Sequence, residues 1–141
     1  MQHLEDTPVP VRIKLAALWA SAMFCYIYGD YFWLYRPGKL QGMLAGIIVP
    51  FGVVTQANLL GATISMAIPS TMIFLSLVLR PSLNRWVNIV LGALYTVFVL
   101  LTMRHAWAFY LFLGAVDMLL ASAIVWYAWT WPRVTAQRQP S

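Results

Sequence analysis

Apolar residues run along this chain in four long stretches, which polar residues, proline and arginine separate. The first stretch covers residues 15–35. As a helix it would measure roughly 31 Å at about 1.5 Å per residue, which matches the hydrocarbon thickness of a bilayer. Arg36-Pro37-Gly38 follows it, and proline disfavours helix at the residue before it. We therefore expect a membrane-spanning helix over residues 15–35.

The same pattern predicts three further spans, over residues 56–79, 83–103 and 107–131. Between the first two spans, residues 43–54 are also apolar, but Pro50 and Gly52 interrupt them. About a dozen residues are too few to cross a bilayer as a helix. This segment is therefore expected to be re-entrant or interfacial.

Together these elements predict an all-α, polytopic membrane protein. Its transmembrane domain, residues 15–131, is a four-transmembrane-helix bundle with a short re-entrant or interfacial segment between helices 1 and 2. Residues 1–14 form a polar N-terminal arm, and residues 132–141 form a polar tail. Composition agrees, because the chain is 62% hydrophobic and 9% charged, whereas soluble domains carry about a quarter charged residues. The lipid bilayer is thus an expected partner.

The basic residues stand at the ends of the apolar stretches, although the net charge is +5. This placement is typical of membrane flanks and argues against nucleic-acid binding. Four spans put both termini on one side of the membrane. Basic residues are more numerous on that side (Arg12, Lys14, Arg80, Arg85, Arg133 and Arg138) than on the other (Arg36, Lys39 and Arg104). The bias predicts that both termini are cytoplasmic.

Neither metal nor cofactor binding is indicated by the sequence. The chain has one cysteine, Cys25, and two histidines, His3 and His105, which fall on opposite predicted faces. No paired-cysteine motif or glycine-rich phosphate loop occurs. No spacing supports a nucleophile–base pair. We therefore expect no cofactor and no catalytic residues, and an enzyme acting on a lipid or quinone is the weakest alternative.

Asp117 is the most unusual residue of the predicted spans. It lies ten residues after Trp107, roughly 15 Å along a helix and so near the bilayer midplane. A charge at that depth costs a few kcal/mol. Asp117 is therefore a candidate transport or proton site. The alternative is a protonated or hydrogen-bonded contact between helices.

Asp30 stands among aromatic residues near the other end of the first span. Asp30 is a second candidate transport or proton site. Beside it we predict an outer entrance formed by Tyr28, Tyr31, Arg36, Arg104 and His105. Tyrosine hydroxyls at a membrane interface can hydrogen-bond a carboxylate. The alternative is a structural cap in which Asp30 pairs with tyrosine or arginine.

Four amide side chains form a possible polar pathway. Asn84 and Asn88 are four residues apart and share one helix face, which also favours helix packing. Gln56 and Asn58 begin the second span, where they would either line a vestibule or face interfacial water.

Several stretches resemble a known family. ALWASAMFCYIYGDYFWLYRPGKLQGM, MAIPSTMIFLSLVLRPSLNRWVNIVLGALYT and IVWYAWTWP are similar to an uncharacterised family of small bacterial four-helix membrane proteins, a domain of unknown function. The resemblance runs from about Leu4 to Pro132, and YGDYF and NRW are its most specific motifs. It implies a bacterial inner membrane location and supplies no activity.

Two functions remain open on the sequence. The first is a transporter or channel-like protein for protons, a small cation or a small solute, which uses an intramembrane carboxylate. The second is a non-catalytic accessory or assembly subunit that docks a partner through its aromatic first helix. A homo-oligomer or a membrane protein partner is expected in either case, because four short helices leave little room for a complete path.

Overall fold

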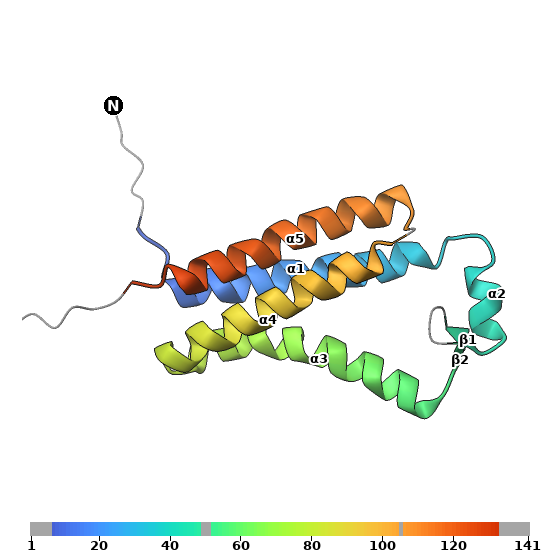
Figure 1. The fold of residues 1–141 in the computed structure, drawn as a ribbon, viewed down its shortest axis with the longest axis horizontal. Coiled ribbons are helices and arrows are strands. Elements are labelled where there is room, and N and C mark those ends of the chain that lie inside the picture. Colours follow the sequence, from blue (N-terminus) through green and yellow to red (C-terminus); the bar gives the residue numbers. More distant parts are fainter. Residues whose placement is uncertain (1–6, 49–51, 105, 133–141) are drawn as a thin grey trace, which may run out of the picture.

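Four long helices make up most of the protein. The computed structural model describes residues 7–48, 52–104 and 106–132. The long helices are α1 (Val11–Trp33), α3 (Gln56–Val78), α4 (Pro81–Thr102) and α5 (Ala108–Trp129) (Figure 1). Each is long and apolar enough to cross a membrane. The prediction of an all-α bundle of four membrane-spanning helices is confirmed.

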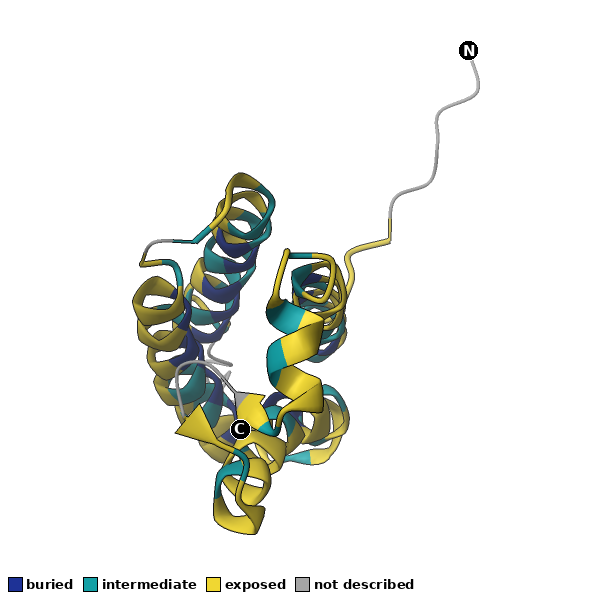
Figure 2. Cartoon of the chain, turned by 90° about the vertical axis from the view of Figure 1, so that its right-hand side faces the viewer, coloured by how far each residue is buried: buried dark blue, intermediate teal, exposed yellow. Residues whose placement is uncertain are grey.

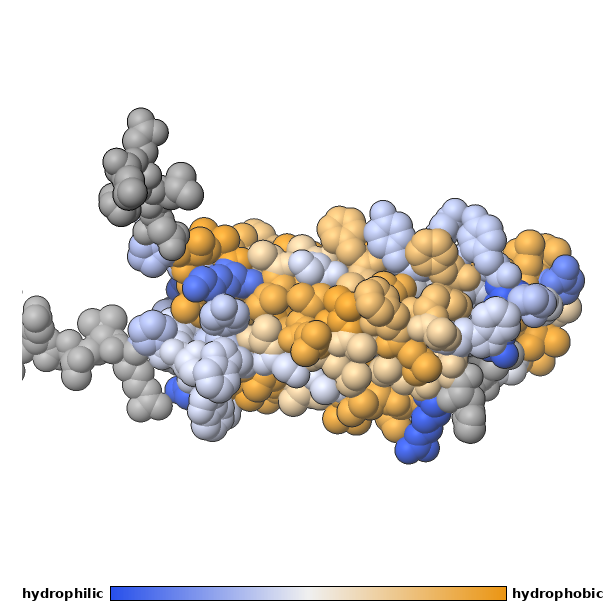
Figure 3. Space-filling model, turned by 90° about the horizontal axis from the view of Figure 1, so that it is seen from above, coloured by the Kyte–Doolittle hydropathy of each residue, from blue (hydrophilic) through white to orange (hydrophobic). Residues whose placement is uncertain are grey.

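The helices run up and down along one common direction. α1 begins and α5 ends at the same end of the bundle, here called the terminal end (Figure 1). The opposite end, where α1 and α4 end and α3 and α5 begin, is here called the hairpin end. α1 packs against both α3 and α5, and α5 packs against α4, whereas α3 and α4 touch each other much less. An apolar belt covers the middle of the molecule, and hydrophilic residues gather toward both ends (Figure 3).

The first helix begins earlier than the sequence pattern suggests. α1 starts at Val11, directly after Pro10, and so includes Arg12 and Lys14. Both side chains have partners at the terminal end. The Arg12 guanidinium donates a 2.9 Å hydrogen bond to the Leu77 carbonyl near the end of α3, and Lys14 lies 5.0 Å from the centre of the Tyr127 ring. These contacts allow basic residues within the first turn of α1. Arg12 also gives a partner to a carbonyl at the end of α3, where the helix supplies no donor.

The segment between α1 and α3 folds at the hairpin end, beyond the helices of the bundle (Figure 1). It contains the short helix α2 (Lys39–Leu44) and a two-stranded antiparallel hairpin of β1 (Ile47–Ile48) and β2 (Gly52–Val53). The re-entrant or interfacial placement of residues 43–54 stays a prediction, and residues 49–51 lie outside the described part of the chain. The strands were not expected from the sequence, and Gly46 and Gly52 allow them by adopting φ values of 72° and 80°.

A hydrogen-bonded cluster of buried polar groups joins three helices toward the terminal end. The Trp19 indole donates to Oδ1 of Asn88 at 2.7 Å, the Asn88 amide donates to Oδ1 of Asn84 at 2.6 Å, and the Asn84 amide donates to the Ser76 carbonyl at 2.6 Å. All four side chains are at most 1% exposed. They come from α1, α4 and α3, so the cluster fixes these helices against one another.

Small residues matter for packing on α4 and less on α3. A Cβ atom at Gly92 would lie 2.9 Å from a Val125 methyl group, so this glycine allows α4 and α5 to approach closely. A Cβ atom at Gly61 would meet nothing within 4 Å, because that face of α3 is exposed. The difference agrees with the general arrangement, in which buried residues lie on the inward faces of the helices (Figure 2).

Candidate functional site

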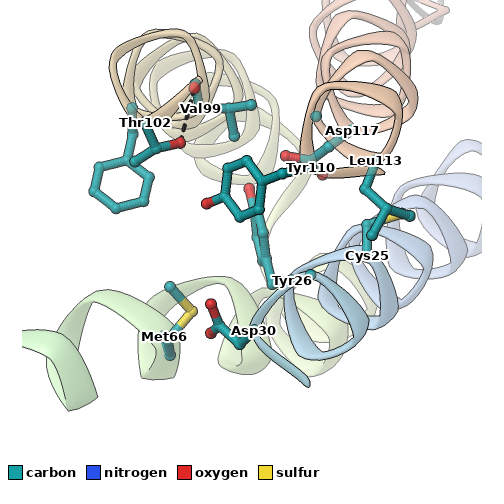
Figure 4. A pocket seen from close by; sticks show the side chains of 12 residues that line it. Cys25, Tyr26, Asp30, Met66, Val99, Thr102, Tyr110, Leu113 and Asp117 are labelled. Carbon is teal, nitrogen blue, oxygen red and sulfur yellow. Dashed lines mark hydrogen bonds between the residues drawn. The ribbon is translucent and has the colours of Figure 1, made fainter. Parts of the chain in front are cut away.

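A cavity of about 50 Å³ lies inside the hairpin half of the bundle, with room for a few water molecules. All four long helices contribute to its wall (Figure 4). From α1 come Cys25, Tyr26, Gly29 and Asp30, and from α5 come Tyr110, Leu113, Gly114 and Asp117. α3 supplies Met66, and α4 supplies Phe98, Val99 and Thr102.

Both carboxyl groups of the predicted site line this one cavity. Asp30 lies three residues before the end of α1, about 5 Å along the helix from the hairpin end. Asp117 lies nine residues after the start of α5, about 14 Å from that end. The cavity therefore extends from near the hairpin end to the middle of the bundle, with one carboxyl group toward each end of it.

Asp117 is buried without a partner for its carboxyl group. The residue is 2% exposed, and neither oxygen accepts a hydrogen bond from the described residues. The Tyr26 hydroxyl points toward this carboxyl from α1 without reaching hydrogen-bond geometry (Figure 4). An unpaired carboxylate is costly to bury, and a carboxyl group that carries its proton costs less. This residue is suited to holding a proton.

Asp30 has different surroundings. Its side chain is exposed although it lines the cavity, so it lies at the opening. Lys39, in α2, is near enough for its positive charge to act on the carboxyl group. Asp30 can therefore exchange with the exterior, whereas Asp117 can be reached only through the cavity.

The cavity is acidic. Among the residues that the structure describes, no lysine, arginine or histidine lines it. Arg36 instead lies over two aromatic rings, 4.9 Å from the centre of Trp33 and 5.4 Å from that of Trp107. The Thr102 hydroxyl donates to the Val99 carbonyl of its own helix at 2.8 Å. The wall thus offers carboxyl groups and aromatic faces, and few free donors.

Aromatic rings separate the cavity from the polar cluster at the terminal end. Tyr95 lies one turn beyond Val99 along α4, and its ring centre is 6.3 Å from that of Tyr26 and 6.0 Å from that of Trp19. Tyr95 and Trp19 also belong to the buried core with Leu15, Met72, Ile124 and Ala128. The cavity therefore ends near Asp117, and densely packed side chains fill the terminal half.

The structure does not bring the predicted outer entrance together around Asp30. Tyr28 stacks with Phe32, with 6.3 Å between the ring centres, and the Tyr31 and Tyr35 hydroxyl oxygens are 2.8 Å apart. Tyr28 and Tyr31 are 52% and 48% exposed, on a face of α1 that does not line the cavity. Arg36 and Arg104 are absent from its wall as well, and His105 lies outside the described residues.

The predicted polar pathway is also placed elsewhere. Asn84 and Asn88 belong to the buried cluster described above, where hydrogen bonds join them to each other and to the Ser76 carbonyl. Gln56 and Asn58 start α3, where the Asn58 backbone N–H donates to the Thr55 hydroxyl and its amide donates to the Val53 carbonyl. None of the four lines the cavity.

Two site residues were missed by the sequence analysis. Tyr26 lies four residues before Asp30, and Tyr110 lies seven before Asp117. Spacings of four and seven put each tyrosine on the same helix face as its carboxyl group. That periodicity is the signal that would have identified Tyr26 and Tyr110, whereas nearness in sequence pointed to Tyr28 and Tyr31.

Comparison with known families gives one match. The model of a family of unknown function, DUF6326, matches residues 10–137. The chain belongs to DUF6326. The resemblance to an uncharacterised family is thereby confirmed. No curated protein and no solved structure matches the chain.

The DUF6326 match includes the whole of the four-helix bundle and therefore every residue that lines the cavity. The family carries no assigned activity, so the function of this DUF6326 protein has to be argued from the site itself.

Proposed function

We propose that this protein moves protons across the membrane, with Asp117 as the group that binds and releases the proton. One observation carries the proposal: Asp117 and Asp30, on two different helices, line a single cavity, and the deeper carboxyl group has no hydrogen-bond partner among the described residues. An ionisable residue inside a membrane protein is a functional candidate when its burial is not explained by a structural partner.

The cavity suggests a route for the proton. Water that enters at Asp30 would reach the Tyr26 hydroxyl, which lies one helical turn further into the bundle and faces Asp117. The hydroxyl can accept a proton on its oxygen while it gives its own to the next acceptor. Asp117 thereby becomes neutral, which lowers the cost of its burial.

Release on the other side requires the packed terminal half to open. α3 contains Pro69, and it diverges from the other helices toward the hairpin end (Figure 1). Proline inside a helix is a common place for bending. We propose that movement about Pro69 alternately exposes Asp117 to the two sides.

The setting of this function is also part of the proposal. The bias of basic residues along the sequence favours cytoplasmic termini, and the family resemblance implies a bacterial inner membrane. The proton would then enter from the outside. A second copy of the chain, or a membrane protein partner, would complete a path for which one bundle offers little room.

Proton flux into liposomes tests the proposal directly. Purified protein is reconstituted with a pH-sensitive dye inside, and a potassium diffusion potential drives proton entry. We expect wild-type flux that Asp117→Asn abolishes and Asp30→Asn reduces. Tyr31→Phe, on the exposed face of α1, is the matched control and should behave as wild type. Flux that Asp117→Asn leaves unchanged removes Asp117 from the mechanism and refutes the proposal.

A specific observation also favours the accessory-subunit alternative. The hairpin half of α1 and the turn that follows it expose a set of large aromatic side chains, namely Phe24, Tyr28, Tyr31, Phe32 and Tyr35. Aromatic residues are enriched where proteins meet. Gly29 does not belong to this face, because it is buried and faces Tyr110.

Native mass spectrometry of protein taken gently from its own membranes distinguishes the two functions. A stoichiometric second protein, lost on Tyr28→Ala and kept on Asp117→Asn, would support the accessory function. A homo-oligomer without other proteins would favour transport.

A further inference from the structure

We infer that the cavity also binds a small organic monocation with an ammonium group, and that this cation and the proton compete for the same carboxyl groups. The inference rests on the proposed proton site at Asp117, and it names the solute that the proton would be exchanged for.

Charge is the first argument. Asp30 and Asp117 are the ionisable carboxyl groups of the wall, and no basic side chain of the described part of the chain lines it. The nearby basic groups lie outside the wall. Lys39 acts on Asp30 at the opening and lies 5.7 Å from the centre of the Trp33 ring, and Arg36 lies 4.9 Å from the same centre. A cavity of one sign with apolar walls concentrates ions of the opposite sign. It therefore favours a cation and disfavours an anion.

The rest of the wall distinguishes an organic cation from a metal ion. Tyr26, Tyr110 and Phe98 present aromatic rings, which attract ammonium groups through their faces. Met66, Val99 and Leu113 offer apolar contacts for attached carbon atoms. Hard metal ions require six or more oxygen ligands, and no three His, Cys, Asp or Glu residues group as metal ligands within the part of the chain that the structure describes.

Size is the third argument. A volume of about 50 Å³ accommodates only a few atoms larger than hydrogen. Gly29 lines this space, and a Cβ atom there would make an ordinary van der Waals contact with the Tyr110 ring at 3.7 Å. Methylammonium has the charge, the donors and the size that fit.

Binding must release a proton to balance charge. The neutral Asp117 carboxyl group gives its proton to bulk water, and the carboxylate that remains accepts hydrogen bonds from the ammonium group. Among the described residues, the other titratable groups of the cavity wall are Asp30, Tyr26 and Cys25 of α1 and Tyr110 of α5. Met66 of α3 and the cavity residues of α4 are not titratable. Asp117 is thus the group whose proton is exchanged.

Cys25 provides a built-in reporter of occupancy. It is the single cysteine of the chain, and it lines the cavity with Asp117. A cation in the cavity should shield this thiol from a small uncharged maleimide. The control places the thiol elsewhere on α1, in the double variant Cys25→Ser and Tyr28→Cys, whose new cysteine replaces an exposed side chain.

The experiment measures the maleimide labelling rate of the full-length protein in phosphatidylcholine nanodiscs. We expect millimolar methylammonium chloride to slow labelling of Cys25 about tenfold relative to sodium chloride at equal ionic strength, and to release protons into a weakly buffered solution. Asp117→Asn should remove both effects. The control variant should label equally fast in both salts.

A second arm identifies the source of the ammonium group. Nanodiscs that contain phosphatidylethanolamine are compared with phosphatidylcholine nanodiscs without added amine. Slower labelling in the former supports the same ammonium chemistry, supplied by a lipid headgroup. Equal labelling there, with protection by methylammonium, supports a water-soluble amine.

Labelling that neither amine source slows overturns the inference. Proton transport is tested separately, because the liposome flux is measured in the absence of any amine. If Asp117→Asn abolishes the proton flux but no amine slows labelling of Cys25, proton transport is supported and binding of an organic cation is refuted.

Discussion

The Tyr95 hydroxyl of α4 donates a hydrogen bond to the Ser65 carbonyl of α3. Ser65 lies four residues before Pro69, which has no backbone N–H, so the Ser65 carbonyl lacks the i+4 donor of a regular helix. Tyr95 supplies that partner from outside, as neighbouring helices do in membranes. Tyr95 therefore links α3 to α4 close to Pro69. We propose above that α3 moves about this proline.

Removing the Tyr95 hydroxyl should weaken the contact between α3 and α4. We expect Tyr95→Phe to lower the free energy of unfolding by about 1 kcal/mol, because the Ser65 carbonyl loses its donor while the ring keeps its contacts with Trp19 and Tyr26. Thermal unfolding in detergent measures the change. Tyr28→Phe, on the exposed face of α1, is the control, and equal stability of the two variants would contradict the role of the hydroxyl.

The buried amide cluster gives a second prediction. Asn88→Ala leaves the Trp19 indole N–H without its acceptor and Oδ1 of Asn84 without its donor. We expect a loss of roughly 2 kcal/mol in the free energy of unfolding, since buried donors without partners are costly.

Thr96→Val is the matched control for Asn88→Ala, because the Thr96 hydroxyl bonds only the Gly92 carbonyl of its own helix. Its effect should be well under that of Asn88→Ala. Comparable losses for the two variants would show that the cluster contributes nothing beyond its packing.

Close packing of α4 against α5 predicts that Gly92 does not tolerate a side chain. Gly92→Ala would place a methyl group 2.9 Å from Val125 Cγ2, and overpacking typically costs about 1–3 kcal/mol. Gly61→Ala, in open space on α3, should not lower stability. Comparing the two melting temperatures in the same detergent checks the prediction, which fails if Gly92→Ala is tolerated as well as Gly61→Ala.

Much of the fold follows from hydrophobic pattern alone. Runs of about 20 apolar residues can satisfy their backbone in lipid only as helices, so four such runs predict four spans. The start of α1 was harder to predict, because Arg12 and Lys14 look like flanking residues until their partners, Leu77 and the Tyr127 ring, are known. The hairpin after α2 depends on glycine conformations that an apolar segment does not reveal.

The site was only partly predictable. Asp30 and Asp117 can be recognised from the sequence because they are acidic residues within apolar stretches, where burying a charge is costly. Their meeting in one cavity depends on which faces of α1 and α5 are in contact, and no local pattern specifies that. The same limit explains Asn84 and Asn88, whose partners Ser76 and Trp19 come from other helices.

Stability can distinguish a functional Asp117 from a structural one. A buried carboxyl group without a hydrogen-bond partner should destabilise the protein, and functional residues of this kind are retained at the expense of stability. We therefore expect Asp117→Leu to raise the free energy of unfolding by about 1–2 kcal/mol, because the adjoining cavity can receive the larger apolar side chain. Asp30→Leu, at the exposed opening, is the control and should change stability by less than about 0.5 kcal/mol. Thermal unfolding of the purified variants measures both. If Asp117→Leu instead destabilises the bundle, the carboxyl group makes a structural contact between helices, and its burial needs no proton-transfer role to explain it.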